Sequence, residues 1–256
     1  MAEPAAQVPA VQHLVVRYAK RGKMRFASHR DVARVFERGV RRAGLPIAYS
    51  AGFTPHPKIS YAGGAPTGVA SEAEYLSLAL TSREVATHVR ERLNAALPDG
   101  IDVIDVTEHA EGLKADSAAF GRLEASQWRV VLPGVTPAVA QQAVAGFLAL
   151  DAAPVERHIE KKGVRILDAR AAVVELDVLD GDTTTAGPDG GQRAAMTGLE
   201  DCAILRMVVL HTAPAVRPED VLTALRERHG LVPSSPPMTT RLAQGSLALL
   251  AGTSAS

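Results

Sequence analysis

Cysteine is almost absent from this chain, with Cys202 as the single one among 256 residues. A disulfide framework needs several cysteines, and zinc or iron–sulfur centres of the cysteine-rich type need them too, so both are excluded. His29 and His56 have no third ligand at a sensible spacing, and we therefore expect neither a metal nor a cofactor in this chain.

Aromatic residues make up only 4% of the sequence, and no apolar run approaches the length of about 18 residues that marks a membrane helix. The N-terminal stretch AEPAAQVPA lacks the basic and apolar segments of a signal peptide. A hydrophobic fraction of 46% with 22% charged residues is typical of a globular protein. We expect a cytoplasmic protein with no membrane partner.

The net charge is zero, but the charges are not spread evenly. Residues 1–63 contain 11 Lys and Arg against 3 Asp and Glu, which gives 11 − 3 = +8, so the rest of the chain carries −8. Such a split favours a polyanion-binding region near the N-terminus. A solvated helix face is the alternative interpretation.

The first half of the chain predicts the element order β-α-β-β-α-β. A β-branched stretch at 13–19 is followed by a helix that Ser28 and Asp31 begin as a capping box, and Gly44 and Pro46 end. Strands are expected at 47–50, 75–80 and 101–106, and a second helix is expected to begin with the box Thr81-x-x-Glu84.

The second half predicts a similar order, with a helix capped by Thr136. The remaining elements are strands at 128–132, 155–159, 164–178, 202–210 and 238–250, and a helix at 218–229. This order is typical of an α+β protein with two tandem ferredoxin-like (βαββαβ) domains and antiparallel sheets. The expected divisions are a disordered tail at 1–10, a first domain at 11–110, a linker at 111–126, a second domain at 127–250 with a flexible insertion at 180–200, and a tail at 251–256.

The first expected helix carries a series of arginines about one turn apart. Arg30, Arg34, Arg38 and the pair Arg41 and Arg42 lie on one side of it, opposite the apolar positions. Guanidinium groups suit bidentate contact with phosphate and stacking on bases. The pattern predicts contact with RNA or another anionic partner.

Two histidines stand in positions suited to a binding site. His29 lies in the first turn of the arginine-rich helix, and His56 lies between two prolines that stiffen its loop. These two are the weak catalytic candidates. The alternative for His29 is packing over the start of the helix, and the alternative for His56 is a place in a proline-stiffened hairpin corner. The full set of predicted ligand-binding or RNA-binding residues is Lys20, Arg25, Ser28, His29, Arg30, Arg34, Arg38, Arg41, Arg42, Tyr49, Phe53, His56, Lys58 and Ser60.

Motifs between residues 20 and 80 resemble the radical SAM-linked, or radical SAM-associated, proteins, a family with a domain of unknown function. They are Phe26-x-Ser28-His29-x-Asp31, Arg34, Arg38, Arg41-Arg42-Ala43-x-Leu45-Pro46, Tyr49-Ser50-x-Gly52-Phe53-x-Pro55-His56-Pro57-Lys58 and Gly68-x-x-Ser71-x-x-Glu74-Tyr75. Thr54, Ala65 and Thr67 stand where Asn, Leu and Leu are more usual.

The resemblance implies a partner, because such proteins are fused to or encoded beside a radical SAM enzyme, often with a cobalamin-binding region and near an RNase E/G-type gene. The iron–sulfur chemistry would belong to that separate chain, and this chain would be an accessory or substrate-presenting protein, a non-catalytic partner rather than an enzyme. Two alternatives stay open. One is a metal-independent, endoribonuclease-like enzyme that uses His29 or His56 as a general base. The other is a pure protein-docking module.

Overall fold

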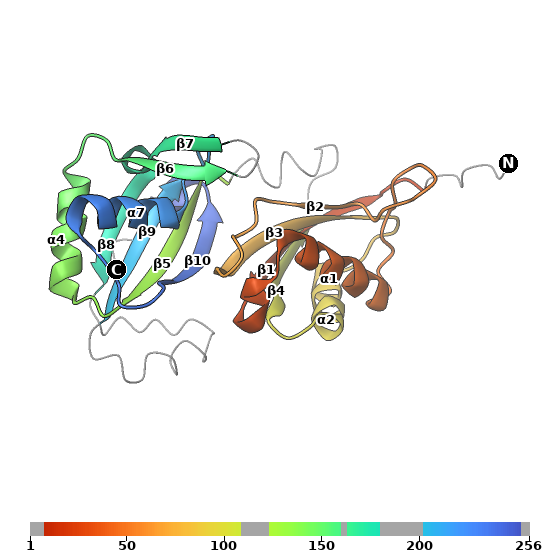
Figure 1. Cartoon of the computed structure of the whole chain (residues 1–256). Coiled ribbons are helices and arrows are strands. Elements are labelled where there is room, and N and C mark those ends of the chain that lie inside the picture. The colour runs from red at the N-terminus through yellow and green to blue at the C-terminus, as the bar shows by residue number, and fades with distance from the viewer. Residues whose placement is uncertain (1–7, 109–122, 160–162, 180–201, 252–256) are drawn as a thin grey trace. The chain divides into compact units, whose positions relative to one another are not determined.

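The computed structural model describes residues 8–108, 123–159, 163–179 and 202–251. The predicted insertion at 180–200 lies outside these residues, as do most of the two predicted tails. The chain forms two compact units, Met1–Arg122 and Leu123–Ser256, each a mixed α/β structure with antiparallel strands (Figure 1). No helix in the described ranges is long and apolar enough to span a membrane.

The first unit is built on an antiparallel sheet. β1 pairs with β3 on one side and with β4 on the other, and β2 pairs with the outer edge of β3. The strand order is therefore β4-β1-β3-β2. Its elements are β1 (Gln12–Lys20), η1 (Gly22–Phe26), α1 (His29–Arg42), β2 (Ile59–Tyr61), β3 (Ala70–Leu80), α2 (Ala86–Ala96) and β4 (Ile101–Glu108).

Helices α1 and α2 lie on the same side of this sheet (Figure 1). Alternate strand residues such as Leu14, Leu76 and Leu78 point to this side, and Phe36 and Leu93 of the helices pack against them, all fully buried. The two-residue period of the strands and the helical period of α1 thus meet in one apolar core.

The predicted first helix is confirmed. Ser28 Oγ accepts a hydrogen bond from the Asp31 N–H at 3.3 Å, and the Asp31 carboxylate accepts one from the Ser28 N–H at 3.1 Å. This reciprocal box fixes the start of α1. Gly44 adopts a φ of +61° just after the helix, which is the left-handed conformation that ends helices.

The predicted start of the second helix at Thr81 was wrong. Both members of the expected capping box have other partners: Thr81 donates two hydrogen bonds to the Pro46 carbonyl, and the Glu84 N–H donates to the Gln12 side chain at 2.9 Å. The Glu84 carboxylate lies 3.3 Å from Arg92. Helix α2 therefore begins only at Ala86.

A continuous strand at 47–50 was also wrong. Ile47 and Tyr49 form only isolated bridges, with Leu80 and Pro57, and the chain then leaves the edge of β3 before it returns as β2. The loop 50–57 is closed at its base by hydrogen bonds between Ser50 and His56 at 2.9 and 3.0 Å. Pro55 and Pro57 have no N–H to continue a ladder.

In the second unit the strand order is β10-β5-β9-β8, again antiparallel, and β6 and β7 form a separate two-stranded sheet. The elements are β5 (Ala125–Pro133), α4 (Pro137–Leu148), β6 (Pro154–Ile159), β7 (Gly163–Asp168), α5 (Ala169–Ala172), β8 (Val173–Leu179), β9 (Cys202–Leu210), α7 (Pro218–His229), β10 (Met238–Gly245) and α8 (Leu247–Ala251).

Three predicted boundaries in this half needed correction. The expected strand at 164–178 is divided by α5, because the Asp168 carboxylate accepts from the N–H groups of Arg170 and Ala171 and starts a helical turn. The last strand ends at Gly245, and α8 follows. β5 begins at Ala125, inside the stretch predicted as a linker.

Candidate functional site

The most distinctive surface of the first unit is the outer side of α1. Arg30, Arg34, Arg38 and Arg41 are all exposed there, and we call these four residues the arginine face. Because each residue turns the helix by about 100°, these positions lie roughly opposite the buried residues. The buried residues of α1 are Val32, Phe36, Gly39 and Val40.

The arginine face forms no close ion pair in the described residues, although the charge of Arg34 also lowers the pKa of Asp31. Asp31, the nearest acid in sequence, is engaged by Ser28, whose side-chain and backbone hydrogen bonds lower the pKa of that carboxyl. The charge of Glu37 acts on Tyr61, adding to the burial that raises the pKa of this phenol. The face therefore presents positive charge to solvent.

Arg42 and Lys58 extend this basic surface. Arg42 is exposed, although its guanidinium also donates to the Ala96 carbonyl at 3.3 Å. Lys58 has an exposed side chain, while its backbone is bonded to Ala48 and Ala79. Arg42 is the last residue of α1, and Lys58 directly precedes β2. The structure thus places six predicted cations on the surface.

Lys20 does not belong to this surface. Only 3% of it is exposed, and its ammonium donates to the carbonyls of Ala65 and Pro66 at 3.1 and 3.3 Å. It therefore fixes the loop that precedes β3. Its role as a predicted RNA contact does not fit this position.

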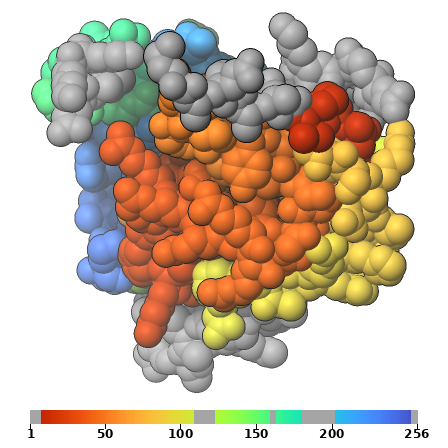
Figure 2. Space-filling model, turned by 90° about the vertical axis from the view of Figure 1, so that its right-hand side faces the viewer, coloured from red at the N-terminus to blue at the C-terminus, as the bar shows by residue number. Residues whose placement is uncertain are grey.

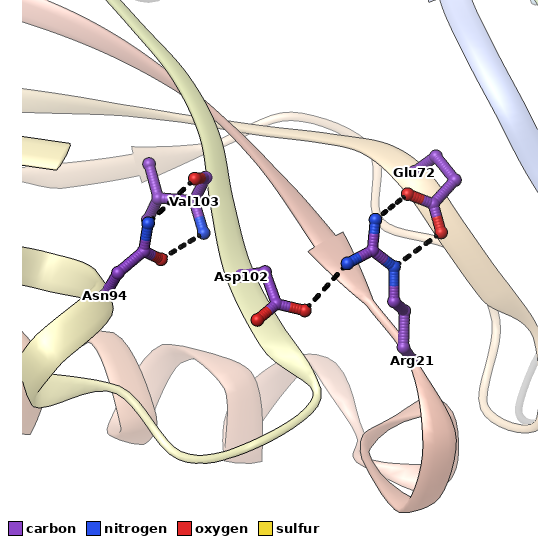
Figure 3. A network of polar contacts seen from close by, with 5 residues as sticks. All are labelled: Arg21, Glu72, Asn94, Asp102 and Val103. Atoms are coloured by element: carbon purple, nitrogen blue, oxygen red, sulfur yellow. Dashed lines mark hydrogen bonds and ion pairs between the residues drawn. The ribbon is translucent and has the colours of Figure 1, made fainter. Parts of the chain in front are cut away.

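Arg21 is likewise engaged inside the unit (Figure 3). Its guanidinium forms a bidentate pair with Glu72 and lies 2.9 Å from Asp102, so it joins the ends of three strands. In the same view the Asn94 side chain bonds both backbone groups of Val103, at 2.7 and 3.0 Å. These contacts fix α2 and β4 and leave Arg21 unsuited to a phosphate.

Arg25 and Phe26 stand immediately before α1. The Arg25 guanidinium carbon lies 4.7 Å from the centre of the Phe26 ring, which is a cation–π contact, and 60% of Phe26 is exposed. Phe53, at the tip of loop 50–57, is 96% exposed. Phe26 was not among the predicted site residues, because a phenylalanine beside a helix start is usually buried.

The two histidines lie beside different parts of β3, His29 near its middle and His56 near its C-terminal end. His29 packs edge-on against Tyr61, with ring centres 5.3 Å apart, and Tyr61 is paired with Leu76. His56 is exposed in the loop that leaves the sheet beside Ala79 and Leu80. The structure does not bring the two imidazoles together, so it offers no shared catalytic pair.

A buried carboxylate lies close to His29. Glu74 is only 3% exposed, and it accepts a hydrogen bond from the Ala65 N–H at 3.0 Å. A Cβ atom on Gly64 would lie 3.5 Å from both the Glu74 carboxylate and the His29 ring. Glu74 alternates with Tyr75 and lies on the same side of β3 as the buried Leu76 and Leu78, and loop residues such as Ala65 complete its cover.

Three further predicted site residues take part in the local structure of the first unit. Ser28 is the helix cap, and its hydroxyl donates to Asp31 at 2.6 Å. Tyr49 packs against the apolar core. Ser60 lies in β2 opposite Ser77, partly exposed.

The second unit has its own polar features, which the sequence did not reveal. A cleft of about 460 Å³ lies between β6 and α7, and the ion pair of the partly buried Arg157 with the buried Asp220, 2.8 Å apart, is in its wall. His211 is held between the Leu123 carbonyl and the Ser126 hydroxyl, at 2.7 and 2.6 Å. In the parts of the chain that the structure describes, no group of three His, Cys, Asp or Glu side chains is placed to hold a metal ion.

Fold and surface together define a two-unit, antiparallel α/β protein with an exposed arginine helix in its first unit. The chain belongs to the family described as an uncharacterized protein conserved in bacteria (DUF2344), whose sequence model matches residues 13–218. No curated protein matches the chain.

Proposed function

We propose that this protein is a non-catalytic accessory subunit that binds RNA through the arginine face and presents it to a separate radical SAM enzyme. One observation carries the proposal: four exposed guanidinium groups on one side of α1 form no ion pair with any described residue. The enzyme partner rests on the sequence resemblance alone. The separation of His29 from His56 is the reason that the proposal contains no cleavage step.

We also infer that each unit is a ferredoxin-like domain. The orders β4-β1-β3-β2 and β10-β5-β9-β8 are the same when only these four strands of each unit are numbered along the chain, with β6 and β7 left out, and both support this assignment. In the first unit, α1 follows the first strand and α2 follows the third. The sheet face opposite these helices has Arg17 beside Tyr75 and Asp105. It offers few aromatic groups to RNA, which supports α1 as the contact surface.

The distribution of net charge in the first unit also supports α1 as the contact surface. The first unit has 16 Lys and Arg and 13 Asp and Glu, a net charge of 16 − 13 = +3. Helix α1 alone has five arginines against Asp31 and Glu37, which is 5 − 2 = +3. The net positive charge of the unit is therefore equal to that of α1 alone. We expect the electrostatic attraction of phosphate groups to be strongest at this helix.

The salt dependence of RNA binding tests this proposal. Each phosphate contact with a single strand contributes about −0.7 to the slope of log K against log salt, so four contacts predict a slope near −3. In the Arg34→Ala/Arg38→Ala variant we expect about half that slope and weaker binding at low salt. Fluorescence anisotropy with a labelled oligonucleotide across a salt series measures both.

The matched control is Arg90→Ala/Arg228→Ala, which removes the same charge from exposed positions of α2 and α7. We expect this control to keep the wild-type slope. Equal slopes for the two double variants would reject the arginine face as the contact, and no binding by the wild-type protein at low salt would reject RNA itself. If the Arg34→Ala/Arg38→Ala variant still binds RNA but no longer binds the enzyme partner, the result would favour a protein-docking module instead.

A further inference from the structure

Two exposed phenylalanines stand at the two ends of the arginine face along the chain. Phe26 precedes α1 by three residues, and loop 50–57 with Phe53 follows from the segment after its C-terminal end. In Figure 2 the red-orange of α1 and the orange of the segment that follows it lie side by side on one face of the first unit. The chain has only five phenylalanines, and burying a ring is strongly favourable, so the exposure of two in the segments that flank one basic helix in the chain requires an explanation.

We propose that these features form a track for a single-stranded nucleic acid, with phosphates on the arginine face and a base stacked on Phe26 and on Phe53. This inference rests on the proposed function and specifies its ligand. Single-strand binding proteins combine a basic path for the backbone with aromatic side chains on which bases stack. From Arg30 to Arg41 the helix rises about 16 Å, which a strand of a few nucleotides spans.

The geometry at Phe26 suits a base. The Arg25 guanidinium is stacked on the Phe26 ring at 4.7 Å, while 60% of the residue remains exposed. A base could therefore lie against the open part of the ring and receive the adjacent positive charge. Phe53 is almost fully exposed on a loop that Ser50 and His56 close and that two prolines stiffen, so stacking there costs little ordering entropy.

A duplex cannot use these rings, because its bases are already stacked inside it. The inference therefore predicts a preference for single strands that the arginine face alone does not. Neither ring reads a base edge, so we expect little sequence preference. Nor does either ring read a ribose hydroxyl, so a DNA strand of the same sequence is expected to bind within a few-fold of RNA.

The experiment measures binding of an RNA of about 12 nucleotides, within the site sizes of single-strand binding folds, to the full chain. Phe26→Ala and Phe53→Ala are each expected to weaken binding roughly tenfold, with an unchanged salt slope because the phosphate contacts remain. Phe26→Leu, which keeps apolar bulk without an aromatic face, should behave like Phe26→Ala. Val85→Ala, which truncates another exposed apolar residue of the first unit, should bind like the wild type.

An abasic strand of the same length separates stacking from charge. The wild-type protein should bind the abasic strand as weakly as the Phe26→Ala/Phe53→Ala variant binds ordinary RNA. The variant should bind the abasic strand and ordinary RNA with the same affinity. Circular dichroism establishes whether each variant is folded. Phe53 lies in an exposed loop, so Phe53→Ala should fold normally. It therefore still tests the inference if Phe26→Ala fails to fold.

The outcomes distinguish the two proposals. One outcome rejects the stacking track and keeps RNA binding. In it the salt slope depends on Arg34 and Arg38, but the phenylalanine variants bind RNA as tightly as the wild-type protein does. The wild-type protein also binds the abasic strand and the duplex as tightly as it binds the ordinary single-stranded RNA. A more than tenfold preference for RNA over DNA would assign the affinity to ribose contacts and would also overturn it. If no nucleic acid binds at low salt, both proposals fail.

Discussion

Gly100 shows how one residue can determine the stability of the first unit. It adopts a φ of +87°, and a Cβ atom there would lie 2.7 Å from the Arg21 carbonyl oxygen. We expect Gly100→Ala to lower the free energy of unfolding by about 3 kcal/mol, from backbone strain and the clash together. Gly22→Ala is the matched control, because Gly22 also has a positive φ but has open space at its Cβ. Its cost should be only about 1–2 kcal/mol.

Urea unfolding of the two variants measures the difference. Because Arg21 also joins Glu72 and Asp102, Gly100→Ala should disturb the ion pairs drawn in Figure 3, whereas Gly22→Ala should not. Equal losses in the two variants would show that the Arg21 carbonyl moves aside freely.

His211 makes a second contribution, one that depends on pH. Burial lowers the pKa of its imidazole; the Leu123 carbonyl opposes this shift, and the charge of Arg241 adds to it. The unfolded chain therefore takes up the proton first as the pH falls. The contribution of His211 is complete above its unfolded pKa of about 6.5 and is lost as the pH falls below that value.

Replacing His211 with Gln removes the titration and keeps a side chain that can reach Ser126. We expect the free energy of unfolding of the wild-type protein to fall more steeply than that of His211→Gln between about pH 6.5 and 5. Denaturant midpoints at several pH values provide the comparison. Parallel curves would mean that His211 titrates alike in the folded and unfolded chains.

Burial of single charged residues was the least predictable property from the sequence. Lys20 and Glu74 are charged residue types that are usually exposed, yet both are 3% exposed and hold the same loop residue, Ala65. That loop lies 45 residues beyond Lys20 in the chain. Local patterns report the near neighbours of a residue, and these partners are not near in sequence.

The contact between α4 and α7 depends on a glycine in a helix interior. A Cβ atom on Gly146 would lie 2.5 Å from the His229 ring, so the two helices approach through this position. In an open helix, Gly→Ala stabilises by about 0.8–1 kcal/mol. Here we expect the opposite sign, a loss of about 1–3 kcal/mol from overpacking.

A double-mutant cycle isolates that contact. With His229→Ala in the background, Gly146→Ala should become neutral or stabilising, since the clashing ring is gone and only helix propensity remains. Thermal unfolding of the four proteins gives the coupling free energy. Additive effects would place the cost of Gly146→Ala elsewhere in the helix.

Helices and strands could be predicted where their signals were local and undisturbed. The capping box of Ser28 and Asp31 located α1, because both residues bond each other and nothing else competes. The similar box at Thr81 and Glu84 failed, because Pro46 and Gln12 provide partners from distant parts of the chain. The arginine face could be predicted for the same reason as α1, whereas Phe26 was missed.

Taken as a whole, the molecule separates its charge by unit. The second unit has 12 basic and 15 acidic residues, a net charge of −3, against +3 for the first. An acidic unit repels a polyanion, so if the proposed RNA binding holds, we expect it on the first unit. On the same proposal, the protein partner would contact the second unit, which has a cleft of about 460 Å³ between β6 and α7.

This division of labour predicts the result of affinity purification from the native cell. We expect the tagged chain to retain both a radical SAM enzyme and RNA, and to keep the enzyme after nuclease treatment, since the enzyme is proposed to contact protein rather than RNA. Arg34→Ala/Arg38→Ala should lose RNA, measured by sequencing of the bound fraction, and retain the enzyme, measured by mass spectrometry. Arg90→Ala/Arg228→Ala should retain both. Loss of the enzyme together with RNA in the first variant alone would mean that the arginine face docks the enzyme, because a charge-matched change elsewhere leaves both in place.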